Sequence, residues 1–120
     1  MSEDAIGVVR RFNEALNAGD LSGMMACLTD DTVFENTEPA PDGERFEGKA
    51  VVGAFWKAFL ASSAQARIEV EELVACGERV VMRWRYAWTD TSGASGHVRG
   101  VDVYRLRRGR IAEKLSYVKG

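Results

Sequence analysis

The chain contains one histidine, His97, and two cysteines, Cys27 and Cys76, among its 120 residues. A metal site built from several histidines is therefore excluded. The cysteines lack C-x-x-C spacing, which excludes a zinc knuckle and a dithiol redox motif, and we expect both thiols to be small buried side chains. The sequence predicts no metal ion.

Motifs for cofactors and for targeting are also missing. The chain has no G-x-G-x-x-G, P-loop or G-x-S-x-G, the usual signals for dinucleotides, nucleotides and a serine nucleophile. Its net charge of -2 provides no basic surface for nucleic acid or an anionic membrane. Apolar runs are short, and the first residues, MSEDAIGVV, lack the basic and apolar regions of a signal peptide. We therefore expect a cytoplasmic protein that has no cofactor. We also expect it to bind neither nucleic acid nor a membrane.

The N-terminal half of the sequence predicts helices. Apolar residues recur at helical spacing up to Gly19, at Ile6, Val9, Phe12 and Leu16. Asp20 can cap a second, short helix, which we expect to end at a turn over residues 29–31. Residues 49–62 carry a broad apolar stripe and predict a third helix that packs on a sheet.

Strand patterns fill most of the remainder. Residues 32–36 predict a first strand, followed by a polar loop over residues 37–48 that contains both prolines. Four further strands are predicted at 66–76, 79–90, 97–107 and 110–118. Their short links suit antiparallel neighbours, so we expect an α+β fold with a single domain over residues 1–120.

The predicted strand over residues 79–90 has the clearest alternation in the chain. One of its faces carries Val80, Met82, Trp84, Tyr86 and Trp88. A stripe of this kind is more often plain core than the wall of a ligand cavity, and pattern alone favours core.

Asp102 lies in the middle of the next strand, in the segment RGVDVYRL, where aspartate is uncommon. If it faces outward, it can pair with a surface arginine: Arg83, Arg85 or Arg99. If it faces inward against the aromatic rings, burial favours its neutral form and makes it an acid or base for proton transfer. The alternation does not decide between these alternatives.

Segments in a particular order carry a family resemblance. The opening VVRRFNEALNAGDLSGMMACLTDDTVFEN, the segment FEGKAVVGAFWKAF and the closing RGVDVYRLRRGRI resemble the nuclear transport factor 2-like superfamily, and more closely its SnoaL-like and ketosteroid-isomerase-like branch. The resemblance implies a cone-shaped, strongly bent mixed sheet packed on the N-terminal helices, a cystatin-like fold with a ligand cavity inside. It also implies homodimers that form through the outer face of the sheet.

The resemblance to ketosteroid isomerases covers three functional positions. Their general-base aspartate falls on Asn36, the tyrosine of their oxyanion hole on Phe12, and their protonated carboxylic acid on Asp102. An amide cannot accept a proton as a carboxylate does, and a phenylalanine cannot donate a hydrogen bond. Classical steroid isomerisation is therefore not expected.

The resemblance to limonene epoxide hydrolase is similarly partial. The asparagine that helps to hold its water matches Asn36, and a tyrosine two residues earlier corresponds to Phe34. The arginine and two aspartates of that enzyme fall near Trp84, Tyr86 and Ser116. A water molecule bound at Asn36 in this chain would therefore have no carboxylate base at the same position.

Several polar residues have both a functional and a structural interpretation. Asn36 can orient a substrate or start an Asx turn, and Tyr86 can bind a ligand or be a core tyrosine satisfied by a carbonyl or by Asp102. Lys114 and Ser116 share one face of the last strand and could reach the cavity.

The functional prediction is a small-molecule enzyme of the isomerase or cyclase type. It acts by proton transfer on a hydrophobic carbonyl or polyketide-like substrate, with Asp102 as the acid–base group and Asn36 and Tyr86 as orienting residues. The residues predicted to contact the substrate are Phe12, Leu16, Phe34, Trp56, Phe59, Trp84, Trp88, Tyr104 and Ser116. His97, out of phase with Asp102, is expected at the surface. The alternative is a non-catalytic module that binds a ligand or dimerises.

Overall fold

A computed structural model describes residues 2–62 and 66–120 of the chain. The helices are α1 (Ser2–Ala18), α2 (Leu21–Ala26) and α3 (Lys49–Ser62), and the strands are β1 (Leu28–Glu35), β2 (Arg45–Glu47), β3 (Arg67–Cys76), β4 (Arg79–Thr89), β5 (Ser95–Arg107) and β6 (Arg110–Val118). These elements confirm the predicted α+β class. Within this part of the chain, no helix is long and apolar enough to cross a membrane.

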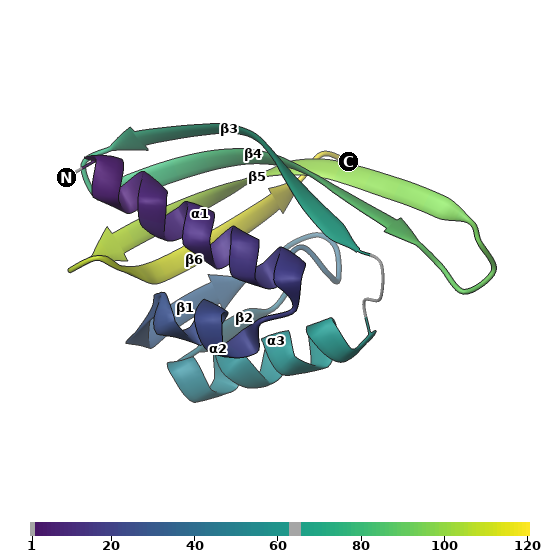
Figure 1. Ribbon diagram of the computed structural model, residues 1–120, viewed down its shortest axis with the longest axis horizontal. Coiled ribbons are helices and arrows are strands. Elements are labelled where there is room, and N and C mark those ends of the chain that lie inside the picture. Colours follow the sequence, from purple (N-terminus) through teal and green to yellow (C-terminus); the bar gives the residue numbers. More distant parts are fainter. Residues whose placement is uncertain (1, 63–65) are drawn as a thin grey trace.

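The strands form one mixed sheet in the order β2-β1-β6-β5-β4-β3. Strands β3 to β6 form an antiparallel meander, whereas β1 lies parallel to β6. Figure 1 shows the sheet bending so that β3 and β4 arch over α1, while α3 lies against β1 and β2. The sheet is curved and unclosed, because β2 and β3 remain as its two edges.

The core lies between the concave face of the sheet and the helices. Its most deeply buried side chains include Val9, Phe12, Met24, Val52, Val80, Met82, Tyr104 and Ile111. Burying one such apolar side chain stabilises the fold by roughly 1.5–3 kcal/mol relative to leaving it exposed. Along β4, the inward residues Val80 and Met82 belong to this core, whereas the later residues Trp84, Tyr86 and Trp88 line a cavity.

Helix boundaries follow the predicted caps. The Asp20 side chain accepts a hydrogen bond from the Gly23 backbone N–H at 2.9 Å, as expected for the residue that caps α2. The helix predicted over residues 49–62 has the observed bounds of α3.

The region after α2 differs from the sequence-based prediction. Residues 29–31, predicted as a turn, belong to β1, which begins at Leu28 rather than at residue 32. The Thr32 hydroxyl donates to the Ile111 carbonyl at 3.0 Å, and the Ile111 N–H donates to the Cys27 carbonyl at 2.7 Å. Pairing with β6 therefore overrides the local preference for a turn.

Two smaller predictions also need correction. Residues 45–47, predicted as part of a loop, form β2 and pair with the end of β1. Cys27 is buried as expected, but Cys76 is exposed, because it ends the edge strand β3.

A bulge in the β5–β6 hairpin determines which side chains of β6 face inward. Ile111 pairs with Leu106, but the register then shifts by one residue and Ala112 has no partner. Such a shift moves every later side chain to the opposite face of the sheet. Lys114 consequently lies across from the buried Tyr104, on the concave side.

Candidate functional site

A cavity of about 770 Å³ opens between the concave face of the sheet, α1, α3 and the loop after β1. Its lining residues are Asn13, Leu16, Phe34, Asn36, Thr37, Glu38, Ala40, Phe55, Trp56, Phe59, Ile68, Trp84, Tyr86, Trp88, Val98, Asp102, Lys114, Ser116 and Val118. The volume lies within the range of small-molecule sites, and the lining is mainly aromatic and aliphatic.

Aromatic side chains form one continuous wall of the cavity. Phe34 stacks on Trp56 with ring centres 5.0 Å apart, and Trp56 meets Phe59 edge-on at 5.3 Å. Phe59 contacts Tyr86 at 6.0 Å, and Tyr86 contacts Trp88 at 5.5 Å. The wall therefore runs from β1 across α3 to the far end of β4.

Two glycines on β5 make room for the tryptophans of this wall. Trp84 pairs with Gly100 and Trp88 pairs with Gly96 across the β4–β5 ladder. A Cβ atom on Gly100 would lie 2.5 Å from the Trp84 ring, and one on Gly96 would lie 2.7 Å from the Trp88 ring. The indoles can lie over the neighbouring strand only because these positions have no side chain.

Asp102 lies at the inner end of the cavity and is only 3% exposed. The Trp84 indole N–H donates to its Oδ1 at 2.9 Å, and the Tyr104 hydroxyl donates to its Oδ2 at 3.2 Å. The Lys114 ammonium forms an ion pair with Oδ2, with Nζ 3.3 Å away. The carboxyl therefore faces inward, and the arginines considered as surface partners pair with glutamates of β3 instead.

Lys114 is held on its other sides by a hydroxyl and by aromatic rings. Its Nζ donates to the Ser116 Oγ at 3.1 Å and lies 4.6 Å from the centre of the Phe34 ring and 5.3 Å from that of Trp56. Its side chain is 9% exposed. An ammonium over ring faces in a dry site gains cation–π attraction, which offsets part of its lost hydration.

Asn13 and Tyr104 form a hydrogen-bond chain that ends at the Asp102 carboxyl. The Asn13 amide donates to the Tyr104 hydroxyl oxygen at 3.3 Å and to the Val9 carbonyl at 2.9 Å. Because Asn13 donates to that oxygen, the hydroxyl proton points to Asp102. Burial, with the nearby charge of Asp102, holds the pKa of Tyr104 well above 10.0, so the phenol remains a neutral donor.

The expected chemistry of Asp102 changes with these partners. The isomerase resemblance implies a neutral acid in an apolar site, but an ammonium and two hydrogen-bond donors surround this carboxyl. Asp102 is therefore paired with an opposite charge and does not lie in a purely apolar environment. The structure thus presents an ammonium–carboxylate pair at the inner end of the cavity.

Most residues predicted for the site do line the cavity. They are Leu16, Phe34, Asn36, Trp56, Phe59, Trp84, Tyr86, Trp88, Asp102 and Ser116. Phe12 does not line it and packs edge-on against Trp56 at 5.9 Å, and Tyr104 is buried behind Asp102. His97 is exposed, as expected.

Asn36 and Tyr86 differ in whether their side chains already form hydrogen bonds within the protein. The Asn36 Oδ1 accepts the Glu44 N–H at 2.8 Å, and the Asn36 N–H donates to the Glu44 carbonyl at 3.1 Å, which fastens the loop at the cavity mouth. The Tyr86 hydroxyl makes no hydrogen bond to any residue that the structure describes. Tyr86 therefore offers a free hydroxyl to a ligand, whereas the Asn36 oxygen already accepts one hydrogen bond and its amide nitrogen is the group left to donate.

Sequence reasoning did not predict the pairing of Lys114 with Asp102 or the support from Asn13. An unbroken hairpin across the RRG turn would place Lys114 opposite Val103, on the outer face; the bulge places it inside. The signal for this bulge is the adjacent apolar pair Ile111 and Ala112. Both residues are buried, and two adjacent residues of a strand can both face inward only at a bulge.

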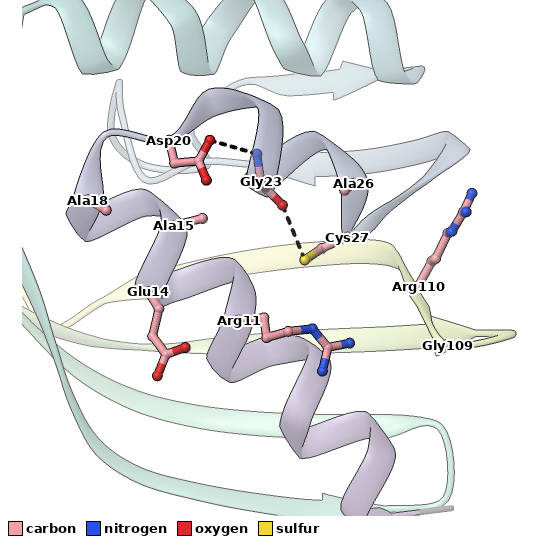
Figure 2. A pocket seen from close by; sticks show the side chains of 10 residues that line it. All are labelled: Arg11, Glu14, Ala15, Ala18, Asp20, Gly23, Ala26, Cys27, Gly109 and Arg110. Atoms are coloured by element: carbon pink, nitrogen blue, oxygen red, sulfur yellow. Dashed lines mark hydrogen bonds between the residues drawn. The ribbon is translucent and has the colours of Figure 1, made fainter.

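A second, shallower hollow of about 480 Å³ lies between α1, α2 and the β5–β6 turn. Figure 2 shows Arg11 and Arg110 approaching it from separate elements, and the Cys27 thiol directed at the Gly23 carbonyl, 3.5 Å away. Burial raises the pKa of Cys27, which makes its thiol a poor nucleophile. The buried polar side chains Asn13, Asp102 and Lys114 line the larger cavity instead, so that cavity is the candidate site.

The family model described as "SnoaL-like domain" matches residues 9–114. The chain belongs to the SnoaL-like domain family. This confirms the superfamily and branch that the sequence resembles. Among curated proteins, none matches.

Solved structures share the SnoaL-like fold. An NTF2-like protein of unknown function from Mesorhizobium loti is 38% identical, with a TM-score of 0.83 over 99% of this chain and 93% of that one. A Mycobacterium tuberculosis protein in complex with estradiol-17beta-hemisuccinate is 25% identical, with a TM-score of 0.82 over 98% and 94%. A putative polyketide cyclase from Xanthomonas campestris is 24% identical, with a TM-score of 0.79 over 98% and 92%.

Tyr104 should stay protonated in the folded protein well above pH 10.0, because burial and the charge of Asp102 raise its pKa. An ultraviolet titration of tyrosinate should show the same amplitude for the folded wild type and for Tyr104→Phe, because Tyr104 forms tyrosinate only when the protein unfolds. Because the folded pKa is raised, the contribution of Tyr104 to stability is complete below pH 10.0 and is lost as the pH rises further. A smaller folded-state amplitude in Tyr104→Phe than in the wild type would contradict this assignment.

Proposed function

We propose that the protein is an enzyme that transfers a proton at the carbon next to the carbonyl group of a hydrophobic, polyketide-like compound. The observation that carries the proposal is the ion pair at the inner end of the aromatic cavity, in which Lys114 Nζ lies 3.3 Å from Asp102 Oδ2. A proton acceptor and a cationic donor are thus close enough to act on one carbonyl group and its neighbouring carbon.

The reaction follows from the charges of the two groups. The substrate oxygen binds a Lys114 N–H, which withdraws electron density from the carbonyl. Asp102 accepts the proton from the adjacent carbon, and the ammonium stabilises the enolate oxygen that forms. Return of the proton to a different carbon gives an isomer, and attack of the enolate on a second carbonyl gives a cyclised product.

Other residues of the cavity position the substrate. The free Tyr86 hydroxyl and the Asn36 amide nitrogen can donate to a second oxygen of the ligand, and the aromatic wall binds its apolar body. The steroid ester in the Mycobacterium tuberculosis relative supports a ligand of this size and hydrophobicity.

A specific observation favours a second function, a module that binds such a ligand without catalysis. Asp102 already has three partners in Trp84, Tyr104 and Lys114, and these occupy both of its carboxyl oxygens. An epoxide hydrolase is less well supported, because the resemblance places its arginine and two aspartates near Trp84, Tyr86 and Ser116, none of which is an arginine or an aspartate.

The enzyme proposal can be tested by proton exchange. The protein in D₂O should catalyse deuterium incorporation next to the carbonyl of at least one compound in a panel of apolar ketones and polyketide analogues, measured by NMR. Asp102→Asn should slow this exchange by about 100-fold, because general-base catalysis is lost. His97→Gln, on the outer face of the same strand, should leave the rate unchanged.

Circular dichroism should first establish that Asp102→Asn is folded. Exchange at the wild-type rate in this folded variant would contradict the role of Asp102. Ligand binding without exchange for any compound would instead support the non-catalytic module.

The outer face of the sheet is also proposed to form a homodimer. Tyr117, 54% exposed, and Val74, 50% exposed, lie on this face beside the ion pairs of Arg83, Arg85 and Arg99. Light scattering should give twice the chain mass of 13.2 kDa. Tyr117→Glu should yield a monomer, whereas Lys57→Gln on α3 should not, and a monomeric wild type would contradict the proposal.

A further inference from the structure

We propose that Lys114 is a nucleophile that forms an imine with the carbonyl carbon of an aldehyde or ketone in the cavity. The inference rests on the proposed function, since it requires a carbonyl compound at the inner end of the cavity. It adds a covalent intermediate to that function and assigns a new role to the amine.

The surroundings of Lys114 suit a nucleophilic amine. Among the cavity-lining residues that the structure describes, it is the one lysine. Its Nζ lies within 5.9 Å of the ring centres of Phe34, Trp56 and Tyr104, and its side chain is almost fully buried. Water is therefore scarce around the amine, which is the environment in which a lysine becomes available for Schiff-base chemistry.

Asp102 is placed to carry the protons of the reaction. Its Oδ2, 3.3 Å from Nζ, accepts one ammonium proton and leaves a neutral amine. The nitrogen lone pair then forms a bond to the carbonyl carbon, and the carbonyl oxygen takes the proton back from Asp102. The adduct nitrogen returns a proton to Asp102, which passes it to the hydroxyl as the C–O bond breaks. Water leaves, the carboxylate is restored, and the carbon is held as an iminium.

The charges of the resting site are preserved through this sequence. An ammonium–carboxylate pair is replaced by an iminium–carboxylate pair, so the donors from Trp84 and Tyr104 continue to stabilise the same carboxylate. An iminium withdraws electrons more strongly than a carbonyl group does, so the adjacent C–H becomes more acidic. The carboxylate beside it can then remove that proton, which connects the imine to the proposed proton transfer.

Reductive trapping tests the inference. The protein is incubated with naphthaldehyde or benzylacetone as the probe and with sodium cyanoborohydride, and the adduct is located by intact mass and peptide mapping. The adduct should form on Lys114 at least about tenfold faster than on the exposed Lys57 or Lys119, because Lys114, unlike these two, lies beside Asp102 in an apolar cavity.

Two variants make the test selective. Lys114→Arg keeps the positive charge beside Asp102 and should lose the rapid adduct, whereas Lys119→Arg should retain it. Adduct that is spread evenly over the exposed lysines, or that forms as fast in Lys114→Arg, would overturn the inference.

The outcome also separates the imine from the proposed function. Deuterium exchange that persists in Lys114→Arg, with no trapped adduct in the wild type, would overturn the imine and leave proton transfer by Asp102 intact. Absence of both exchange and adduct would overturn both proposals.

Discussion

The ion pair between Asp102 and Lys114 is the interaction on which the rest of the site depends. Two opposite charges are held away from water, and their desolvation costs several kcal/mol per ion unless other groups compensate. The compensation comes from separate strands: Trp84 on β4, Tyr104 on β5 and Ser116 on β6. The pair therefore joins side chains from three neighbouring strands at one end of the cavity and gives an apolar pocket its chemistry.

Features of the backbone bring these side chains together. The bulge at Ala112 turns Lys114 to the concave face, and Gly100 leaves the space in which the Trp84 indole reaches Asp102. Both features act before any ligand binds, so the polar groups are positioned by strand register rather than by loops. Positioning on strands suits proton transfer, since the distances between reacting groups must be held closely.

Much of this organisation could be predicted from the sequence. The bounds of α3, the meander of four strands and the aromatic face of β4 follow from period and capping. The start of β1 and strand β2 could not be predicted, because long-range pairing with β6 and β1 outweighs turn propensity there. The pairing of Lys114 with Asp102 could not be predicted for a related reason. A single unpaired residue, Ala112, moves the later side chains of β6 to the opposite face of the sheet, and it changes the apolar–polar alternation of the sequence only slightly.

A double-mutant cycle for unfolding tests the central role of the ion pair most directly. Asp102→Asn and Lys114→Met should each reduce the free energy of unfolding by about 3–5 kcal/mol, because each leaves one buried charge without its partner. The double variant should lose less than the sum of the two, with a coupling energy of about 1–3 kcal/mol. Additive losses, within about 0.5 kcal/mol, would show that the two groups do not interact and would contradict this account of the site.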